Sequence, residues 1–200
     1  MKLMIKPIIA LMALAVPAIL AGPLPAQEKA GAPVLLTSCG QSPGPTRFQI
    51  FLKKLQIDHV YNDQATARDL AAKKSSGAPF KSLIIVTGAS LKGMGAAGVS
   101  INDEIARTKA LIEEARKQGI KVIGAHVEGM SRRAQGAAPG DNSDEISIDA
   151  VCPFSALMII RKDGNEDGRF TAISKAGGIP MIEFDKSLEL EQLLANLFAK

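Results

Sequence analysis

Aromatic residues are scarce in this 200-residue chain, which has no tryptophan, one tyrosine and seven phenylalanines. Basic residues are never concentrated either, because no run of lysine or arginine exceeds two residues. Nucleic-acid binding needs a concentrated basic footprint. The pattern therefore argues against a nucleic-acid partner, although the formal net charge is +4 at pH 7.

Cysteine occurs only at Cys39 and Cys152. Two cysteines in an exported chain would invite a disulfide. The topology predicted below places them at opposite ends of a sheet, and even a four-residue strand spans roughly 13 Å. Because a disulfide needs Cα atoms within about 7 Å, we predict two free thiols.

No hydrophobic run reaches the roughly 20 residues that a membrane span needs. The apolar stretch Ile8–Leu20 follows Lys2 and Lys6 and precedes the small residue Ala26. This order is typical of a cleavable secretory signal, with an uncleaved anchor helix as the alternative. We predict a signal peptide over residues 1–26, a periplasmic or secreted mature protein, and no membrane association after cleavage.

Residues 33–200 are predicted to form a single domain, because about 174 residues remain after cleavage, enough for one sizeable core. Strand-like and helix-like stretches alternate with short connections, which favours a three-layer α/β fold with a doubly wound parallel sheet, flavodoxin- or Rossmann-like. Six strands are expected, near residues 34–37, 59–61, 83–86, 122–125, 157–160 and 181–184. The second strand is short and polar, so the order 2-1-3-4-5-6 is preferred over 3-2-1-4-5-6.

The clearest helix follows the third strand. Ser100 and Asp103 have the spacing of a capping box, and apolar residues then recur on one face. Gly119 stands where a left-handed C-cap belongs.

In such sheets ligands bind beyond the carboxyl ends of the strands, where the strand order reverses. Here that point lies between strands one and three. The loop after strand one carries Ser38, Gln41 and Ser42 as side-chain donors beside the start of a helix, a place that attracts anions. The alternative is a capped helix with Ser42 or Gly44 as its N-cap.

The loop after strand three contains G-x-G-x-x-G at Gly93, Gly95 and Gly98. It resembles the fingerprint of short-chain dehydrogenases, but that motif belongs to the first strand–helix unit. Those enzymes also use a Tyr-x-x-x-Lys pair after the motif, whereas Tyr61 precedes it. We therefore expect neither a short-chain dehydrogenase nor any cofactor.

The same loop can still lie close to a ligand, because glycines let the backbone approach closely. Its predicted contacts are Ser90, Lys92, Gly93 and Gly95, with Lys92 as the cation.

A long connection from about residue 126 to 143 carries Arg132 and Arg133. Loops of this length are often lids or binding loops, and arginine grips carboxylate or phosphate through two parallel hydrogen bonds. We predict that replacing both arginines with alanine abolishes ligand binding and leaves stability nearly unchanged. A solvated loop without a ligand is the alternative.

The segment 163–168 copies the opening of a calcium loop. Ser174 stands where that loop needs its bidentate glutamate, so a tight turn is preferred, with Asp167 capping the next helix. Asn165 and Asp167 are then candidate ligand contacts. His126 and Glu128 share one predicted strand face, but two ligands do not make a metal site.

Catalysis would need a nucleophile, a base and an orienting acid. Cys39 and Ser42 are the plausible nucleophiles and His126 the plausible base, while no G-x-S-x-G elbow occurs. A buried structural thiol is the commoner role for a cysteine. We therefore assign no catalytic residue.

Four motifs together look like an exported bacterial α/β family of unknown function. They are Thr37-Ser38-x-Gly40-Gln41-Ser42, Lys92-Gly93-Met94-Gly95-Ala96-Ala97-Gly98, Arg132-Arg133 and Gly164-Asn165-x-Asp167-Gly168. The resemblance spans nearly the whole mature chain. It implies export and the α/β fold, but no activity.

These observations predict an exported domain that binds a small anionic molecule at the carboxyl ends of its strands. A hydrolase or transferase using the same crevice is the first alternative, and a docking subunit for another exported protein is the second. The sequence makes no prediction of oligomeric state.

Overall fold

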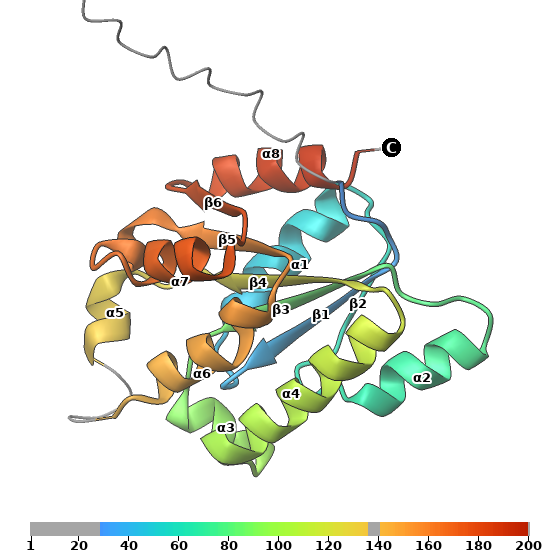
Figure 1. Ribbon diagram of the computed structural model, residues 1–200, viewed down its shortest axis with the longest axis horizontal. Coiled ribbons are helices and arrows are strands. Elements are labelled where there is room, and N and C mark those ends of the chain that lie inside the picture. Colours follow the sequence, from blue (N-terminus) through green and yellow to red (C-terminus); the bar gives the residue numbers. More distant parts are fainter. Residues whose placement is uncertain (1–28, 136–140, 200) are drawn as a thin grey trace, which may run out of the picture.

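The computed structural model describes residues 29–135 and 141–199 (Figure 1). The predicted signal peptide over residues 1–26 lies outside these ranges. Within them, no helix is long and apolar enough to cross a membrane.

Six strands form one parallel sheet in the order β2-β1-β3-β4-β5-β6, which confirms the preferred topology. The strands are β1 (Val34–Cys39), β2 (His59–Tyr61), β3 (Ser82–Thr87), β4 (Lys121–His126), β5 (Leu157–Arg161) and β6 (Met181–Phe184). The short strand β2 lies at one edge, as its length and polarity predicted. The strand order reverses between β1 and β3.

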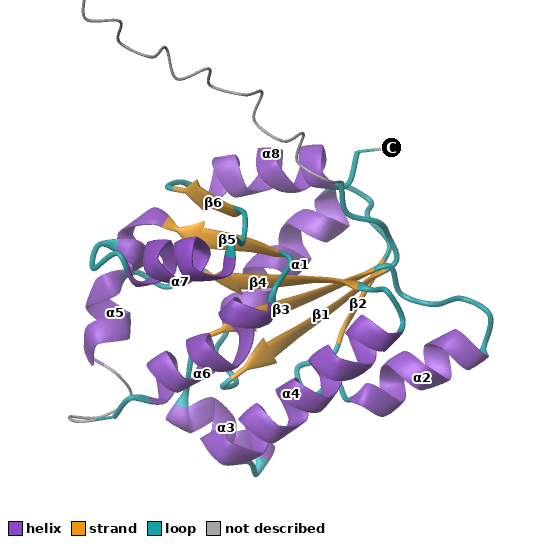
Figure 2. Cartoon of the chain, viewed as in Figure 1, coloured by secondary structure: helices purple, strands orange, loops and turns teal. Residues whose placement is uncertain are grey.

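Helices cover both faces of the sheet (Figure 2). The helices are α1 (Gly44–Lys54), α2 (Ala67–Ser75), α3 (Leu91–Ala97), α4 (Ile101–Lys117), α5 (Met130–Gln135), α6 (Ser143–Val151), α7 (Arg169–Gly177) and α8 (Ser187–Leu197), with 3₁₀ turns η1 (Cys152–Phe154) and η2 (Lys162–Asn165). Helices α1 and α8 pack on one face, and α2, α4, α6 and α7 pack on the other.

Each face of the sheet has its own apolar core. Leu36 and Ile84 meet Phe48 of α1 on one side, while Leu35 and Leu111 of α4 meet on the other. Strands covered on both faces carry continuous apolar runs rather than alternating ones. Full burial of one such side chain contributes about 1.5–3 kcal/mol, so the two cores hold the strand ends in fixed positions.

Helix α4 has the boundaries that its sequence predicted. The hydroxyl of Ser100 accepts a hydrogen bond from the Asp103 N–H at 3.2 Å, and the Asp103 carboxylate accepts one from the Ser100 N–H at 2.8 Å. Gly119 follows the helix with φ +71°. The capping box and the left-handed C-terminal glycine are therefore both confirmed.

Two segments that we expected to be loops contain helices. Residues Leu91–Ala97 form α3 and Met130–Gln135 form α5. Each glycine in a helix interior costs about 1 kcal/mol relative to alanine, so the glycine-rich sequence predicts a loop. In α3, packing overrides propensity, because Met94 is buried and the Ser90 hydroxyl caps the Gly93 N–H at 3.0 Å.

Both cysteines are free and buried, as predicted. Burial raises the pKa of the Cys39 thiol to about 11 and raises that of Cys152 further. Both thiols therefore stay protonated at neutral pH, which makes them poor nucleophiles.

Candidate functional site

A cleft of about 540 Å³ opens at the carboxyl ends of β1, β2 and β3. It is lined by Gln41, Ser42, Pro43, Tyr61, Asp63, Gln64, Ser90, Lys92, Gly93, Ala96 and Ala97. Its volume lies in the range of roughly 300–1,000 Å³ that is usual for small-ligand sites. The cleft also lies beside the point where strand order reverses, where ligands bind in folds of this type.

Five residues that the sequence predicted as ligand contacts come together in this cleft. They are Gln41, Ser42, Ser90, Lys92 and Gly93. The walls also include Tyr61, the last residue of β2, and Asp63 and Gln64 from the segment after it, none of which the sequence predicted as a ligand contact. Because β2 is an edge strand of three residues, its pattern gave no reason to examine the residues after it.

The backbone after β1 is held in an uncommon conformation. Gly40 and Gln41 have φ values of +99° and +58°. A side chain at Gly40 would lie 2.6 Å from the Gly88 carbonyl oxygen, so only glycine fits there. A positive φ is uncommon at a residue such as Gln41 and marks a segment that its surroundings constrain.

A buried ion pair on α4 provides that constraint. The Glu104 carboxylate accepts hydrogen bonds from the Gly40 N–H at 2.9 Å and from Gln41 Nε2 at 3.1 Å. Arg107 pairs with Glu104 at 2.9 Å and donates to the carbonyls of Ser38 and Ala65, both at 2.7 Å. Helix α4 therefore fixes the segments after β1 and β2 at once.

Sequence reasoning missed both members of this ion pair. Glu and Arg three residues apart on a helix usually form a solvated surface pair. A signal was available, because Glu104 shares the helical spacing of the buried residues Thr108, Leu111 and Ala115. A carboxylate on the buried stripe of a helix needs a partner, and Arg107 is that partner.

Helix α6 fixes the third wall. Asp144 accepts a hydrogen bond from the Ala89 N–H at 2.5 Å, and the Ser147 hydroxyl accepts one from the Gly88 N–H at 3.1 Å. Burial raises the pKa of Asp144, and the Ala89 N–H acts in the opposite direction. The turn after β3 is thereby held beside Ser42.

The predicted donors differ in what they can offer a ligand. Ser38 is fully buried, and its hydroxyl donates to the Asp63 carbonyl at 3.2 Å. Gln41 Nε2 donates both to that carbonyl, at 3.0 Å, and to Glu104. The hydroxyl of Ser42 accepts from the Gly44 N–H at 3.3 Å, which leaves its own hydrogen available.

Lys92 is the cation of the cleft. Its side chain is exposed and, within residues 29–135 and 141–199, makes no ion pair. Ser90 acts mainly as the N-cap of α3. Gly93 packs its backbone against the carbonyl oxygen of Gln41, whereas Gly95 faces open space.

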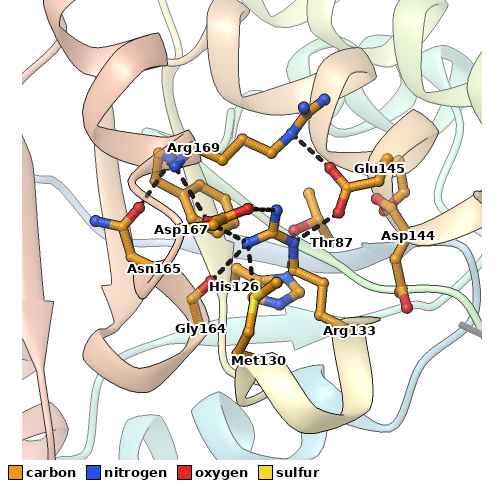
Figure 3. A network of polar contacts seen from close by, with 12 residues as sticks. Thr87, His126, Met130, Arg133, Asp144, Glu145, Gly164, Asn165, Asp167 and Arg169 are labelled. Atoms are coloured by element: carbon orange, nitrogen blue, oxygen red, sulfur yellow. Dashed lines mark hydrogen bonds and ion pairs between the residues drawn. The ribbon is translucent and has the colours of Figure 1, made fainter. Parts of the chain in front are cut away.

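Arg133 lies in a separate, buried cluster rather than in an exposed loop (Figure 3). Its guanidinium pairs with Asp167 at 2.6 Å and with Glu145 at 2.7 Å, and it donates to the Gly164 carbonyl at 2.8 Å. Burial acts to lower the pKa of Arg133, but the bonds to the two carboxylates outweigh it and leave the pKa raised.

The premise of the expectation that both arginines can be replaced without loss of stability is wrong for Arg133, and we now expect its removal to destabilise the fold. That expectation assumed an exposed side chain, whereas only 2% of this one is exposed. Arg132 is different, because its side chain is 49% exposed and only 3.6 Å from Glu128. Neither arginine lines the cleft.

Asn165 and Asp167 also lie outside the cleft lining. The Asn165 side-chain oxygen accepts from the Phe170 N–H at 2.9 Å, and its amide donates to Glu183 at 2.8 Å. Asp167 accepts from the Arg169 N–H at 3.2 Å and holds Arg133. This segment forms the turn that we preferred over a calcium loop. The N-cap residue of α7 is Gly168 rather than the predicted Asp167, and the side chains of Asn165 and Asp167 accept the first N–H groups of the helix.

His126 is fully buried at the end of β4 and its ring packs on Phe170. Thr87 Oγ1 donates its hydrogen to the Ala125 carbonyl at 3.0 Å, so His126 Nδ1 is assigned as the donor to Thr87 at 3.1 Å. Burial and then the nearby Arg133 lower the pKa of His126 to about 4.

The prediction that His126 and Glu128 share one strand face is wrong, because β4 ends at His126 and Glu128 lies beyond it, paired with Arg132. Within the described residues, His126 makes no hydrogen bond to Ser42 or Cys39. No group of three or more His, Cys, Asp or Glu side chains in the described ranges could hold a metal ion.

A six-stranded parallel sheet in the order 2-1-3-4-5-6 with helices on both faces defines an α/β domain of the doubly wound class. The chain belongs to the family described as a domain of unknown function, DUF6305, whose model matches residues 31–198. No curated protein has a significantly similar sequence.

Three solved structures are similar to part of this fold. The esterase EstA from Pseudoalteromonas sp. has a TM-score of 0.33 and 12% identity, covering 76% of this chain and 75% of its own. A GDSL-like lipase from Bacteroides thetaiotaomicron has a TM-score of 0.33 and 15% sequence identity, and the match covers 75% of this chain and 66% of the lipase. The SGNH-hydrolase family esterase AlinE4 has a TM-score of 0.34 and 9% sequence identity, and the match covers 78% of this chain and 76% of AlinE4.

Proposed function

We propose that this protein is an exported domain that binds a small molecule bearing an anionic group in the cleft beside Lys92. The observation that carries the proposal is a single unpaired lysine in a cleft of about 540 Å³ at the switch point of the sheet. A cation without a carboxylate partner among the described residues is available to a ligand, and Ser42 offers a neutral donor in the same cleft.

The rigidity of the walls supports binding. Ordering flexible side chains costs about 0.5–1.5 kcal/mol each on association. Here Glu104 and Arg107 hold two walls and Asp144 holds the third, so little ordering remains to be done when a ligand enters.

Binding is favoured over hydrolysis or group transfer by the position of His126. The imidazole is buried against Phe170 and makes no hydrogen bond to the Ser42 hydroxyl within the described residues, so His126 is not placed to act as its general base. Cys39 is buried and protonated.

A thermal-shift screen against inorganic phosphate, phosphate esters and small carboxylates tests the proposal. We expect at least one anion to raise the melting temperature of the wild-type protein and Lys92→Gln to remove that shift. The control Lys74→Gln changes an exposed lysine of α2 that lies outside the cleft lining. A flat wild-type screen, or equal shifts in Lys92→Gln, would contradict the proposal, and a flat screen would favour a docking subunit.

Export is the second part of the proposal. It is supported by the apolar stretch before the domain and the small residue Ala26. The mass of the protein recovered from the periplasm or medium should show the loss of residues 1–26 or a nearby cut. Recovery of the full-length chain from the cytoplasm would contradict it.

A further inference from the structure

The cleft holds one charge of each sign. Lys92 lies on the wall formed by α3, and Asp63 lies on the wall formed by the segment after β2. Both residues are exposed, and no ion pair within 4.0 Å joins either side chain to another described residue. A ligand with only negative charge would be attracted by Lys92 and repelled by Asp63.

The backbone fixes Asp63 at this wall. Its carbonyl oxygen accepts hydrogen bonds from Thr37 Oγ1 and Ser38 Oγ, both at 3.2 Å, and from Gln41 Nε2 at 3.0 Å. The residue cannot move away from the cleft without breaking three bonds. Its carboxylate has no hydrogen bond or ion pair in the described part of the chain.

A second side chain of the same wall lies beside this carboxylate. Tyr61 and Asp63, two positions apart in the chain, both line the cleft. In agreement, the pKa of Tyr61 is raised by burial and further by the negative charge of Asp63. This end of the cleft presents two acceptors, the Asp63 carboxylate and the Tyr61 phenol oxygen, which suits a cationic group that donates hydrogen bonds.

We infer that the ligand is a small zwitterion, with a carboxylate or phosphate beside Lys92 and an amine beside Asp63. This inference rests on the proposed function and adds a second charge to the same site. An ammonium group brings three donors and no acceptor, so it matches an unpaired carboxylate. Hydrogen bonds between charged partners are roughly twice as strong as neutral ones.

The probes are amino acids of increasing length, from glycine through 4-aminobutanoate to 6-aminohexanoate. Each is compared with the carboxylate of the same length that lacks the amine. Isothermal titration of the wild-type protein at low salt gives the affinity of each pair. We expect at least one amino acid to bind about tenfold or more tightly than its partner, because one charged hydrogen bond contributes roughly that factor.

The variant Asp63→Asn should remove the preference for the amine. It should also make the simple carboxylates bind more tightly than they bind the wild type, because their repulsion by Asp63 is gone. Asp58→Asn, which changes an exposed aspartate before β2 outside the cleft lining, should alter neither affinity. The opposite signs expected for the two ligand types cannot arise from a loss of folding.

Equal binding of amino acids and simple carboxylates to the wild type would overturn the inference, as would an equal loss of both in Asp63→Asn. If simple anions bind in a Lys92-dependent way without any advantage from an amine, this inference fails and the proposed function stands. If no probe and no anion of the thermal-shift screen binds, both fail.

Discussion

His126 and Arg133 are two basic side chains packed on the same aromatic ring. The ring centroids of His126 and Phe170 are 5.2 Å apart, and the Arg133 guanidinium carbon lies 5.4 Å from the Phe170 centroid. Two buried cations at this spacing would repel each other. The arginine keeps its charge through Glu145 and Asp167, so the histidine has to remain neutral.

Stability should therefore fall as the pH drops from about 6.5 to about 4. The pKa of His126 is about 4 in the fold against an ordinary value of 6.5, so in this window the unfolded chain binds the proton more readily. The expected loss over the whole window is about 3 kcal/mol. Urea unfolding at a series of pH values measures it.

The matched variant is His126→Asn, whose amide can still donate to Thr87. It should be less stable at pH 7 but should lose most of the pH dependence between 6.5 and 4. If the free energy of unfolding changes with pH equally in the wild type and the variant between pH 6.5 and 4, His126 is not the group that causes the pH dependence.

Arg133→Ala should destabilise the protein by roughly 2–3 kcal/mol, because it removes the buried donor to the Gly164 carbonyl and leaves Glu145 and Asp167 only their bonds to Arg169. Arg132→Ala is the control. That side chain is half exposed, so the change should stay within about 0.5 kcal/mol. Denaturant unfolding compares the two variants. Equal effects would show that the buried cluster does not stabilise the fold.

At the scale of elements, α3 shows how a glycine-rich segment can form a wall. A side chain at Gly93 would overlap the backbone oxygen of Gln41, whereas a side chain at Gly95 would meet nothing within 4 Å. The first glycine lets the helix approach the segment after β1. The glycine pattern thus reflects helix packing, and Gly98 ends the helix with φ +68°.

This difference gives a paired prediction. Gly93→Ala should destabilise the protein by roughly 2–3 kcal/mol, because backbone atoms must shift to relieve the overlap. Gly95→Ala should stabilise it by about 0.5–1 kcal/mol, because alanine costs less than glycine in a helix interior. Thermal unfolding of both variants is the measurement, and a stabilising Gly93→Ala would contradict the packing described here.

The strands and the longest helix could be predicted because their signals are local. Apolar runs mark β3 and β5, and the capping box with Gly119 marks the limits of α4. The helices α3 and α5 could not be predicted from the sequence, because each is short and depends on tertiary contacts. For α3 these are the buried side chain of Met94 and the cap by Ser90.

At the scale of the whole molecule, the strand order followed from the short, polar second strand, and the order located the cleft. The pairing of charges did not follow from the sequence. Arg133 lies 34 positions from Asp167, and Glu104 lies 64 positions from Gly40. Spacing along the chain carries no signal for such contacts, so the sequence placed Arg133 in a loop and gave no prediction of the partners of Glu104.

The measurement that tests the central claim most directly is amide chemical-shift mapping by NMR. The labelled wild-type protein is titrated with inorganic phosphate, small carboxylates and amino acids. We expect the shifts of the binding probe to concentrate at residues 40–42, 61–64 and 90–93, and to vanish in Lys92→Gln. Shifts centred on Arg132, on the α1–α8 face or nowhere in the protein would contradict a ligand site in this cleft.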